Sequence, residues 1–524
     1  MVSSIIISAQ GYYNIINDTT WNSDTIFIND NVKVFEDATL SISHGTTIKF
    51  NGQYFIEVFG KMNAIGQRND SILFTVNDAT HLHDTSTVLG GWKGIRLLDN
   101  LNDTSIFDYC IFQYGKAVVP GVPFWNTTIP ENYGGALFID GYSSVIISNS
   151  NFRNNFARDK GGAIYADTMS SFSVDNSEFY SNLAKREGGA LYIGNIDNVL
   201  ISNNLFIWND CVLIRPDTIL GGNIWSGAGG GIRLYNPLGN SNATIINNKL
   251  FNNLSVSGII CDAFPQTYVY NNILCNNYAI TYFCSSPKTH SIFSNNIVAN
   301  NLAYVTTAGI ESASNYLLIN NSIVWNNQCE VPGGNEGQIY GILNYEPIVE
   351  YNCVMDGYEG EGNIDSPPLF VNPSAGVGRN FSGADADWSL LDSSPCINTG
   401  TPDTTGLYLP EFDIKDNQRV YGNRIDMGAY ENQYVWVKIN DSPVFNNSVL
   451  VYPNPSKQEL FIELKPGMEG AWIELVDGTG KQIIHSQITT IPALFMPTGL
   501  ESGIYFYRIY NHSIVFKTGK WIKI

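Results

Sequence analysis

The sequence predicts an all-β protein: a right-handed parallel β-helix, a solenoid of stacked coils, followed by a small C-terminal antiparallel β-sandwich. Three observations predict this fold class. Gly-Gly pairs recur every 27 residues, at 134–135, 161–162 and 188–189. Asn-Asn pairs recur every 24 or 25 residues, at 247–248, 271–272, 295–296 and 320–321. The last segment instead alternates apolar and polar residues between Gly and Asp-Gly turns, which is typical of short antiparallel strands.

A repeat of 24 to 27 residues without helical periodicity leaves room only for several short strands joined by turns. Equivalent strands would stack about 4.8 Å apart, with side chains alternating between the bore and the surface. Phe152, Phe179 and Phe206 share the 27-residue spacing and are expected to stack inside the bore. Asn suits the corners because it tolerates left-handed backbone conformations, and stacked amides can hydrogen-bond from coil to coil.

Residues 1–10 look like the remnant of a secretory signal, a short apolar stretch that ends in small residues but lacks a positively charged start. Cleavage is expected near Ala9–Gln10, and the alternative is a first apolar strand. The β-helix is predicted over 11–435, with N-terminal coils over 11–130, regular coils over 131–330 and a closing segment over 331–435. A linker over 436–447 then leads to the sandwich over 448–524.

Distinctive motifs lie in the opening coils at 37–50, 60–66, 72–75, 91–95 and 108–115, and in the closing segment at 367–371, 388–395 and 426–431. They resemble those of a known group, the exported right-handed β-helix proteins of the Bacteroidetes type. Residues 448–524 are similar to the type A C-terminal sorting domain of the type IX secretion system, with landmarks at 451–455, 477–480 and 503–509. An ordinary fibronectin-like sandwich is the alternative for this module.

The resemblance implies that residues 448–524 engage the type IX secretion machinery. It also implies passage through the outer membrane, followed by release or by attachment to the outer cell surface. A formal charge of −20 argues against nucleic acid as the main partner, because phosphate binding needs a basic surface. No apolar run reaches the roughly 18 residues that span a bilayer. We expect a monomer.

The chain has eight cysteines, at positions 110, 211, 261, 275, 284, 329, 353 and 396. An even number in an exported protein permits disulfides, and no Cys-x-x-Cys spacing suggests a zinc site. The alternative interpretation is that they are small buried apolar residues. The sequence does not say which cysteines, if any, are joined.

The best candidates for catalysis lie just before two Gly pairs: Arg158, Lys160, Lys185 and Arg186. A polysaccharide lyase needs a base beside the sugar and cations that neutralise a uronate. The 27-residue spacing also pairs Asp159 with Arg186 and Lys160 with Glu187 on neighbouring coils, so cross-coil ion pairs are the alternative.

An aromatic column is the candidate ligand site. If Leu137, Ile164 and Leu191 point inward, then Phe138, Tyr165 and Tyr192 point outward, with Arg233 as the next member. Exposed rings would stack on a sugar chain, whereas a phase error of one residue would bury them. An insertion over 211–227, which contains Arg215 and Trp225, could wall this groove.

Clustered hard oxygens at Asp385, Asp387, Asp413 and Asp416 could hold calcium, and turn formation is the alternative. No complete catalytic constellation is visible. We therefore expect a secreted or surface-attached protein that binds carbohydrate or mediates surface contacts rather than an enzyme. A polysaccharide lyase, or less readily a glycoside hydrolase, is the first alternative, and a purely structural surface protein is the second.

Overall fold

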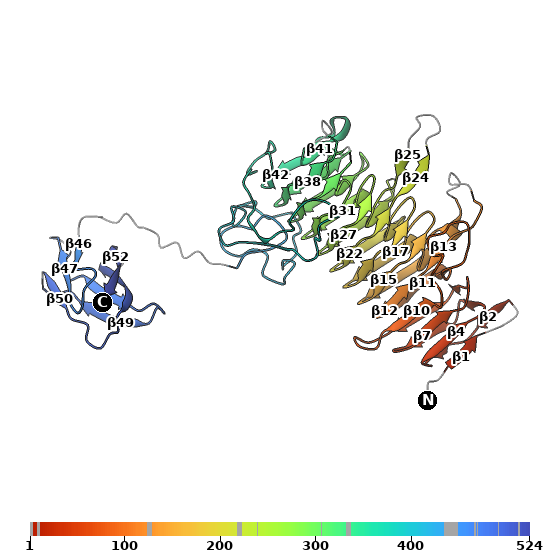
Figure 1. Ribbon diagram of the computed structural model, residues 1–524, viewed down its shortest axis with the longest axis horizontal. Helices are drawn as coiled ribbons and strands as arrows, with labels where there is room; N and C mark the ends of the chain where they lie inside the picture. The colour runs from red at the N-terminus through yellow and green to blue at the C-terminus, as the bar shows by residue number, and fades with distance from the viewer. Residues whose placement is uncertain are drawn as a thin grey trace. The chain divides into compact units, whose positions relative to one another are not determined.

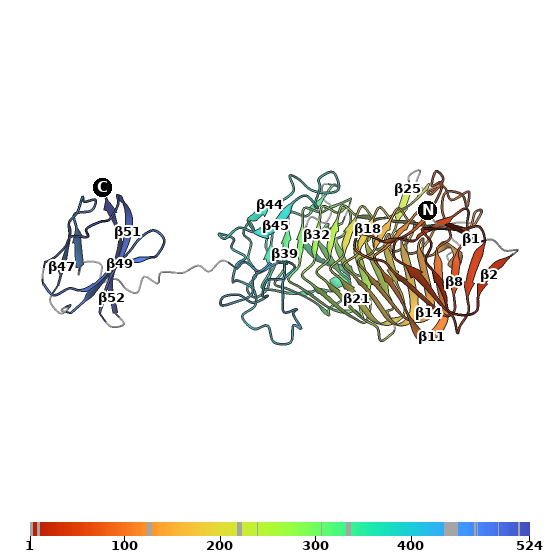
Figure 2. The same cartoon turned by 90° about the horizontal axis from the view of Figure 1, so that it is seen from below.

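The computed structural model describes residues 4–7, 11–122, 128–216, 223–237, 239–304, 306–331, 337–433, 449–465, 468, 470–490, 492–511 and 514–524, without the side chains of 213–226, 343 and 514. The chain forms two compact units, Met1–Tyr434 and Val435–Ile524. The first unit is a parallel β-helix in which three stacks of strands surround one bore (Figures 1 and 2).

The first stack is a 13-stranded parallel sheet. Its strands are, in spatial order, β1 (Ser4–Ile7), β4 (Thr25–Ile28), β7 (Thr47–Phe50), β10 (Ile72–Val76), β12 (Cys110–Gln113), β15 (Asn151–Arg153), β18 (Glu178–Tyr180), β22 (Leu205–Ile207), β28 (Lys249–Phe251), β32 (Ile273–Cys275), β35 (Ile297–Ala299), β39 (Ile323–Trp325) and β43 (Cys353–Val354).

The second stack is a bent parallel sheet with two arms. Three long strands run through both arms: β11 (Ile95–Asp108), β14 (Leu137–Ser148) and β17 (Ile164–Asp175). One arm adds β2 (Tyr12–Ile15), β5 (Asn31–Val34), β8 (Ile56–Val58), β20 (Leu191–Ile193), β26 (Ile232–Tyr235), β30 (Ile260–Ala263), β33 (Tyr282–Cys284), β37 (Ile310–Ser312) and β41 (Ile339–Gly341). The other adds β3 (Thr19–Trp21), β6 (Thr39–Ser43), β9 (Lys61–Ile65), β21 (Ile196–Ser202), β27 (Asn242–Ile246), β31 (Gln266–Tyr270), β34 (His290–Ser294), β38 (Leu317–Asn320) and β42 (Ile348–Glu350).

The third stack consists of two-residue strands: β13 (Lys116–Ala117), β16 (Phe156–Ala157), β19 (Leu183–Ala184), β23 (Asp210–Cys211) and β29 (Leu254–Ser255). It continues through Tyr278, which bridges Leu254 and Leu302, to β36 (Leu302–Ala303) and β40 (Gln328–Cys329). The remaining elements of this unit are the hairpin β24 (Leu213–Pro216) and β25 (Asn223–Ser226), the pair β44 (Phe370–Asn372) and β45 (Asp387–Leu390), and two 3₁₀ turns, η1 (Pro130–Asn132) and η2 (Ile342–Asn344).

The Asn-Asn pairs make the corners, and each member has its own task. The first Asn adopts a left-handed backbone, as Asn247 and Asn271 do with φ of 58° and 54°. The second is buried and joins its amide to the next coil: the Nδ2 of Asn253 donates to Oδ1 of Asn277, whose Nδ2 donates to Oδ1 of Asn301. Two such ladders run through the regular coils, one of them through residues 155, 182, 209, 253, 277, 301 and 327 and the other through residues 204, 248, 272 and 296.

The Gly pairs form a second kind of corner, where the backbone is left-handed and neighbouring coils lie very close together. Gly161 and Gly188 have φ of 66° and 67°, in the left-handed region that favours glycine. The second glycine of each pair lies against the next coil, so that a Cβ on Gly162 would stand 2.0 Å from the carbonyl oxygen of Gly189. The pair therefore marks a corner at which two coils touch backbone to backbone.

Apolar side chains fill the bore, and the predicted phenylalanine stack lies there. The rings of Phe152, Phe179 and Phe206 stack with centroids 5.0 and 4.7 Å apart, and Phe112 extends the stack at 4.6 Å. Burying each ring contributes roughly 1.5–3 kcal/mol. Register is exact from coil to coil, with Phe152 opposite Phe179 and Phe179 opposite Phe206.

The closing segment covers part of the β-helix as well as ending it. Residues from 370 to 431 fold back over the outer face of the 13-stranded sheet, where Trp388, Met427 and Tyr430 pack against Ile297 and Ile323. Corner asparagines hold this segment: Asn252 donates to the carbonyls of Arg379 and Phe381, and Asn276 to those of Gly376 and Gly378.

At the N-terminus, residues 4–7 form β1, which pairs in parallel with β4 and buries Ile7. This is the arrangement of a first strand. The expected cleavage point, Ala9–Gln10, lies outside the described residues, as does the predicted linker, 436–447, and the signal remnant stays a prediction.

The second unit is an antiparallel sandwich, which is the fold predicted for the C-terminal module. One sheet contains β46 (Val449–Tyr452), β47 (Leu460–Leu464) and β50 (Ala493–Phe495). The other contains β49 (Gln482–Gln487), β48 (Trp472–Val476), β51 (Gly503–Asn511) and β52 (Ile514–Lys523). Ile462, Leu475 and Trp521 lie in its core. Across the described chain, no helix is both long and apolar enough to span a membrane.

Replacing one buried ladder residue tests the role of the corners. Asn277→Ala should lower the free energy of unfolding by roughly 2–5 kcal/mol, because it leaves buried groups on Leu250, Asn253 and Asn301 without their partner. Chemical denaturation measures the change. Asn242→Ala is the matched control, since the Asn242 amide donates to Asn198 at the surface. This change should lower the free energy of unfolding by less than about 0.5 kcal/mol. Equal effects of the two changes would contradict the role of the ladder.

Candidate functional site

The aromatic column forms in the predicted register. Phe138 lies opposite Tyr165 and Tyr165 opposite Tyr192, with ring centroids 5.1 and 5.0 Å apart, and Arg233 follows Tyr192. The phase is also as predicted. The neighbouring leucines and isoleucine, Leu137, Ile164 and Leu191, belong to the core of the bore, whereas the rings lie on the other side of the strands in a cluster of their own.

The expectation that these rings are exposed is wrong. Phe138, Tyr165 and Tyr192 are 3%, 8% and 2% exposed. Tyr133, from the segment before the first Gly pair, lies against Tyr165 at 4.9 Å between ring centroids. Charged side chains cover the ends of the column: the guanidinium carbon of Arg96 lies 4.1 Å from the Phe138 centroid, and Nζ of Lys160 lies 4.4 Å from that of Tyr192.

Arg233 is also buried, at 8% exposure. Its Nε lies 3.7 Å from a carboxylate oxygen of Glu187, and its Nη1 donates to Sγ of Cys261 at 2.7 Å. The column therefore has the contacts of a second, outer core layer, and ligand binding by Phe138, Tyr165, Tyr192 and Arg233 stays an untested prediction.

The four cationic candidates are engaged with the protein itself. Arg186 pairs with Asp159 at 3.4 Å and Lys160 with Glu187 at 3.9 Å, which are the cross-coil pairs that the spacing suggested. Arg158 donates to the backbone carbonyls of Val119 and Val122. Burial raises the pKa of Asp159 to about 6, against the opposing effect of the nearby Arg186 and Lys160.

Lys185, the fourth candidate, has a different environment. Its Nζ lies 5.9 Å from the centroid of the Phe156 ring, and burial lowers its pKa while the charge of Asp210 opposes the shift. These contacts describe a packed surface, and a catalytic role for any of the four cations stays untested.

The outer column continues beyond Arg233 through Cys261, Phe283 and Glu311. Glu311 is 4% exposed and accepts a hydrogen bond from the backbone of Thr307. Burial raises the pKa of this carboxyl to about 7.

Asp385, Asp387, Asp413 and Asp416 do not converge. Asp413 is buried, and its carboxylate accepts hydrogen bonds from the backbone N–H groups of Lys415, Asn417 and Glu431. Asp387 accepts from Ser389 and lies 4.0 Å from Lys415. Among the described residues, no group of three or more His, Cys, Asp or Glu side chains could hold a metal ion. Calcium binding stays a prediction, and these contacts are those of turns.

The insertion folds as the antiparallel hairpin of β24 and β25. Arg215 lies opposite Ile224, and Ile214 opposite Trp225. The side chains of Arg215 and Trp225 lie outside the described part of the chain, so the predicted groove wall is not tested.

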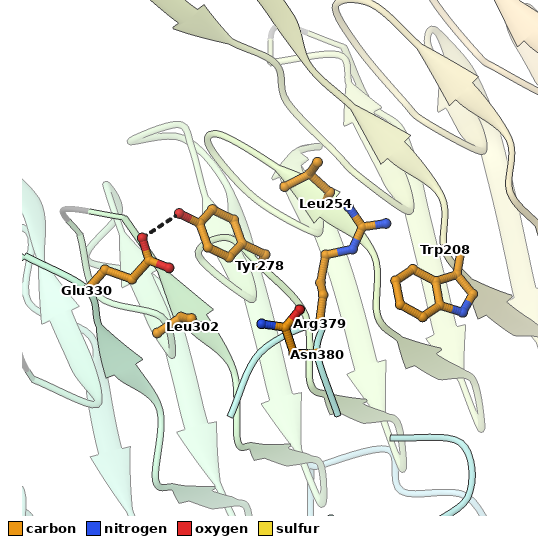
Figure 3. Close-up of a pocket in the computed structure, with 7 residues that line it drawn as sticks. All are labelled: Trp208, Leu254, Tyr278, Leu302, Glu330, Arg379 and Asn380. Carbon is orange, nitrogen blue, oxygen red and sulfur yellow. Dashed lines mark hydrogen bonds between the residues drawn. The ribbon is translucent and has the colours of Figure 1, made fainter. Parts of the chain in front are cut away.

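A surface hollow of about 540 Å³ lies elsewhere, over the third stack (Figure 3). Leu254, Tyr278 and Leu302, three successive rungs of that stack, line it. Trp208 stands at one side, at a corner that follows β22, and Glu330 at the other, where it accepts a hydrogen bond of 2.9 Å from the Tyr278 hydroxyl. Arg379 and Asn380 reach the hollow from the closing segment.

Arg379 is fixed in the hollow by two contacts. Its Nη2 donates to Asp210 at 2.8 Å, and its guanidinium carbon lies 4.9 Å from the Trp208 ring centroid. The Nε of Arg379 is buried and has no hydrogen-bond acceptor among the described residues. Trp208 itself is 37% exposed. The hollow therefore combines an accessible ring with a positioned cation.

Sequence reasoning missed this site, although one signal was available. Trp208 has a left-handed backbone, with φ of 58°, at the corner position that Asn252, Asn276 and Asn300 occupy in later coils. A bulky aromatic residue costs energy at such a corner, where Asn is favoured. The sequence thus showed that Trp208 replaces the expected Asn at this corner. It did not show that Arg379 lies beside the Trp208 ring.

Comparison with protein families adds to this geometry. Residues 134–298 match the model described as a right handed beta helix region. Residues 450–523 match the secretion system C-terminal sorting domain. This chain is an exported right-handed β-helix protein. The sorting domain indicates export by type IX secretion to the cell surface or the extracellular space. A search of the curated proteins finds no match to the chain.

In this exported β-helix protein, the matched β-helix region includes both Trp208 and Tyr278, which places the hollow on the repeated scaffold. Arg379 and Asn380 come from the closing segment, beyond the matched region. The sorting domain implies engagement with the secretion machinery and says nothing about a ligand.

The buried column predicts a loss of stability on truncation. Tyr192→Ala should lower the free energy of unfolding by roughly 3–5 kcal/mol, because it opens a cavity between Tyr165 and Arg233. Denaturant titration measures the change. Tyr180→Ala removes a ring that is 40% exposed and should cost less than about 1 kcal/mol. If Tyr192→Ala were as mild as the control, the column would not be a core layer.

Glu311 predicts a dependence on pH. The folded-state pKa of about 7 lies above the ordinary value of 4.5, so the folded protein holds a proton that the unfolded chain releases. This stabilisation is complete below about pH 4 and is lost as pH rises through 7. From pH 5 to 8, the free energy of unfolding of the wild type should fall by roughly 1–3 kcal/mol more than that of Glu311→Gln. Parallel pH profiles for the two proteins would contradict the assignment.

Proposed function

We propose that this exported protein binds carbohydrate outside the cell, in the hollow between Trp208, Tyr278 and Arg379. The observation that carries the proposal is the pairing of an accessible ring, Trp208, with a cation held beside it by Asp210. Both groups line an open hollow on the surface of the β-helix.

The chemistry of the lining fits a sugar. The carbon-bound hydrogens on one face of a pyranose pack against aromatic faces, and hydroxyl groups need donors and acceptors around the ring edge. Leu254 and Leu302 give the hollow an apolar floor, while Glu330 supplies an acceptor and Asn380 both donors and acceptors.

Binding is favoured over catalysis by the state of the charged groups. A hydrolase needs two carboxylates across one bond, and a lyase needs a base free to take a proton. Around the hollow, Asp210 is paired with Arg379 and Glu330 accepts from Tyr278. Arg158, Lys160 and Arg186 are bonded to carbonyls or carboxylates of the protein. These contacts support the binding hypothesis rather than the lyase alternative.

A glycan array with the full-length protein, followed by titration calorimetry on any hit, tests the proposal. Trp208→Ala should weaken the binding of a hit by about tenfold or more, because aromatic residues are among those whose truncation commonly costs the most binding free energy. Arg379→Met should weaken it as well, since it removes the fixed donor while keeping an apolar chain of similar length.

Tyr340→Ala is the matched control: this ring is 44% exposed, lies on β41 and is not among the residues that line the hollow. It should leave affinity unchanged. The absence of any glycan hit, or a hit whose affinity is the same in Trp208→Ala and wild type, would overturn the proposal and favour a purely structural surface protein.

A further inference from the structure

Two buried cysteines lie where the closing segment meets the last coil. Cys353 begins β43, the last strand of the 13-stranded sheet, and Cys396 belongs to the closing segment that folds back over it. Both side chains are fully buried, and both belong to the core cluster that joins the sheet to the segment. The structure holds them as free thiols.

The two thiols are neighbours within this buried cluster, where the Cys353 side chain is the main cause that raises the pKa of Cys396, and Cys353 Sγ also donates to the carbonyl of Ser366 at 3.1 Å. Their backbones are fixed on both sides. The N–H of Cys353 donates to Ser322 in the previous coil at 2.9 Å, and the carbonyl of Cys396 accepts from Met427 at 2.9 Å. These bonds hold the two cysteines on facing elements, the last coil and the closing segment.

We propose that Cys353 and Cys396 are joined by a disulfide in the exported protein. Each thiol loses its proton, the two sulfurs together lose two electrons, and one S–S bond forms. The electrons pass to a disulfide-bonded oxidant by thiol–disulfide exchange, which reduces that oxidant to a dithiol. Export supplies the setting, because the periplasm that precedes the outer membrane is oxidising.

Burial determines when the bond forms. The thiolate is the attacking species, and a thiol removed from solvent is disfavoured as a thiolate. An oxidant must therefore reach Cys353 or Cys396 before the closing segment packs onto the sheet. Once the segment is in place, the same burial protects the bond from reductants.

The bond would clamp the part of the chain that completes the hollow. The two cysteines are 43 residues apart, and the loop between them contains Arg379 and Asn380. A covalent link across a loop of this length restricts the unfolded chain and so favours the packed state of the segment. The inference rests on export and on the burial of both thiols in one cluster, and it does not depend on carbohydrate binding.

Thiol mapping of the full-length secreted protein tests the proposal. The protein is collected from the medium or cell surface of a type IX secreting host, unfolded in denaturant and treated with N-ethylmaleimide. We expect alkylation of two fewer thiols than the eight cysteines of the chain, and a cross-linked peptide pair that contains Cys353 and Cys396. Eight alkylated thiols, or a cross-link that joins other cysteines in their place, would overturn it.

Thermal unfolding with and without dithiothreitol is the second measurement, made after brief exposure to denaturant so that the reductant has access. Reduction should lower the midpoint of wild type by roughly 3–10 °C. Cys353→Ala and Cys396→Ala should show no such shift. Cys275→Ala, a buried change in the same core cluster, should keep it. If dithiothreitol left the midpoint temperature of wild-type unfolding unchanged, that result would contradict the proposal, whatever the stability of the variants.

Discussion

The stacking of coils depends on how the corners treat backbone polar groups. A left-handed corner turns the chain sharply, and the groups on its inner side are removed from water. Each buried polar group that lacks a partner would cost about 1–3 kcal/mol. The asparagine ladders meet this need rung by rung. In the ladder through Asn272, the amide donates to the carbonyl of Ile245 and to Oδ1 of Asn296, while its own oxygen accepts from Asn248. Register then follows, because a shift by one residue would break every rung at once.

The same corners also position the closing segment on the outside of the β-helix. The left-handed asparagines, Asn252 and Asn276, point their amides outward and hold the closing segment by its carbonyls. Arg379 lies within this held stretch, so it arrives beside Trp208 and Asp210. The hollow depends on the corners in this sense, since the second asparagine of each pair joins the coils and the first holds the segment that completes the site.

The repeat allowed much of the first unit to be predicted. Spacing alone placed Phe152 on Phe179 and Tyr165 on Tyr192, and it paired Asp159 with Arg186 across coils. It did not predict exposure, because Tyr133 covers the tyrosine column from outside the repeated pattern. It also missed the hollow, since Arg379 and Asp210 are 169 residues apart and no local pattern joins them. Periodicity describes the neighbours above and below each residue, and says nothing of segments that return from a distance.

Backbone amide exchange in the native full-length protein, read by mass spectrometry, tests most directly whether the corners hold the closing segment. The N–H of Gly378 donates to the carbonyl of Asn300, and that of Gly383 to the side chain of Asn252. Peptides over 376–383 should therefore exchange slowly, together with those of the coils that carry Asn252 and Asn300. Rapid exchange over 376–383 beside protected coils would contradict the account, because the corner asparagines would then not hold the segment.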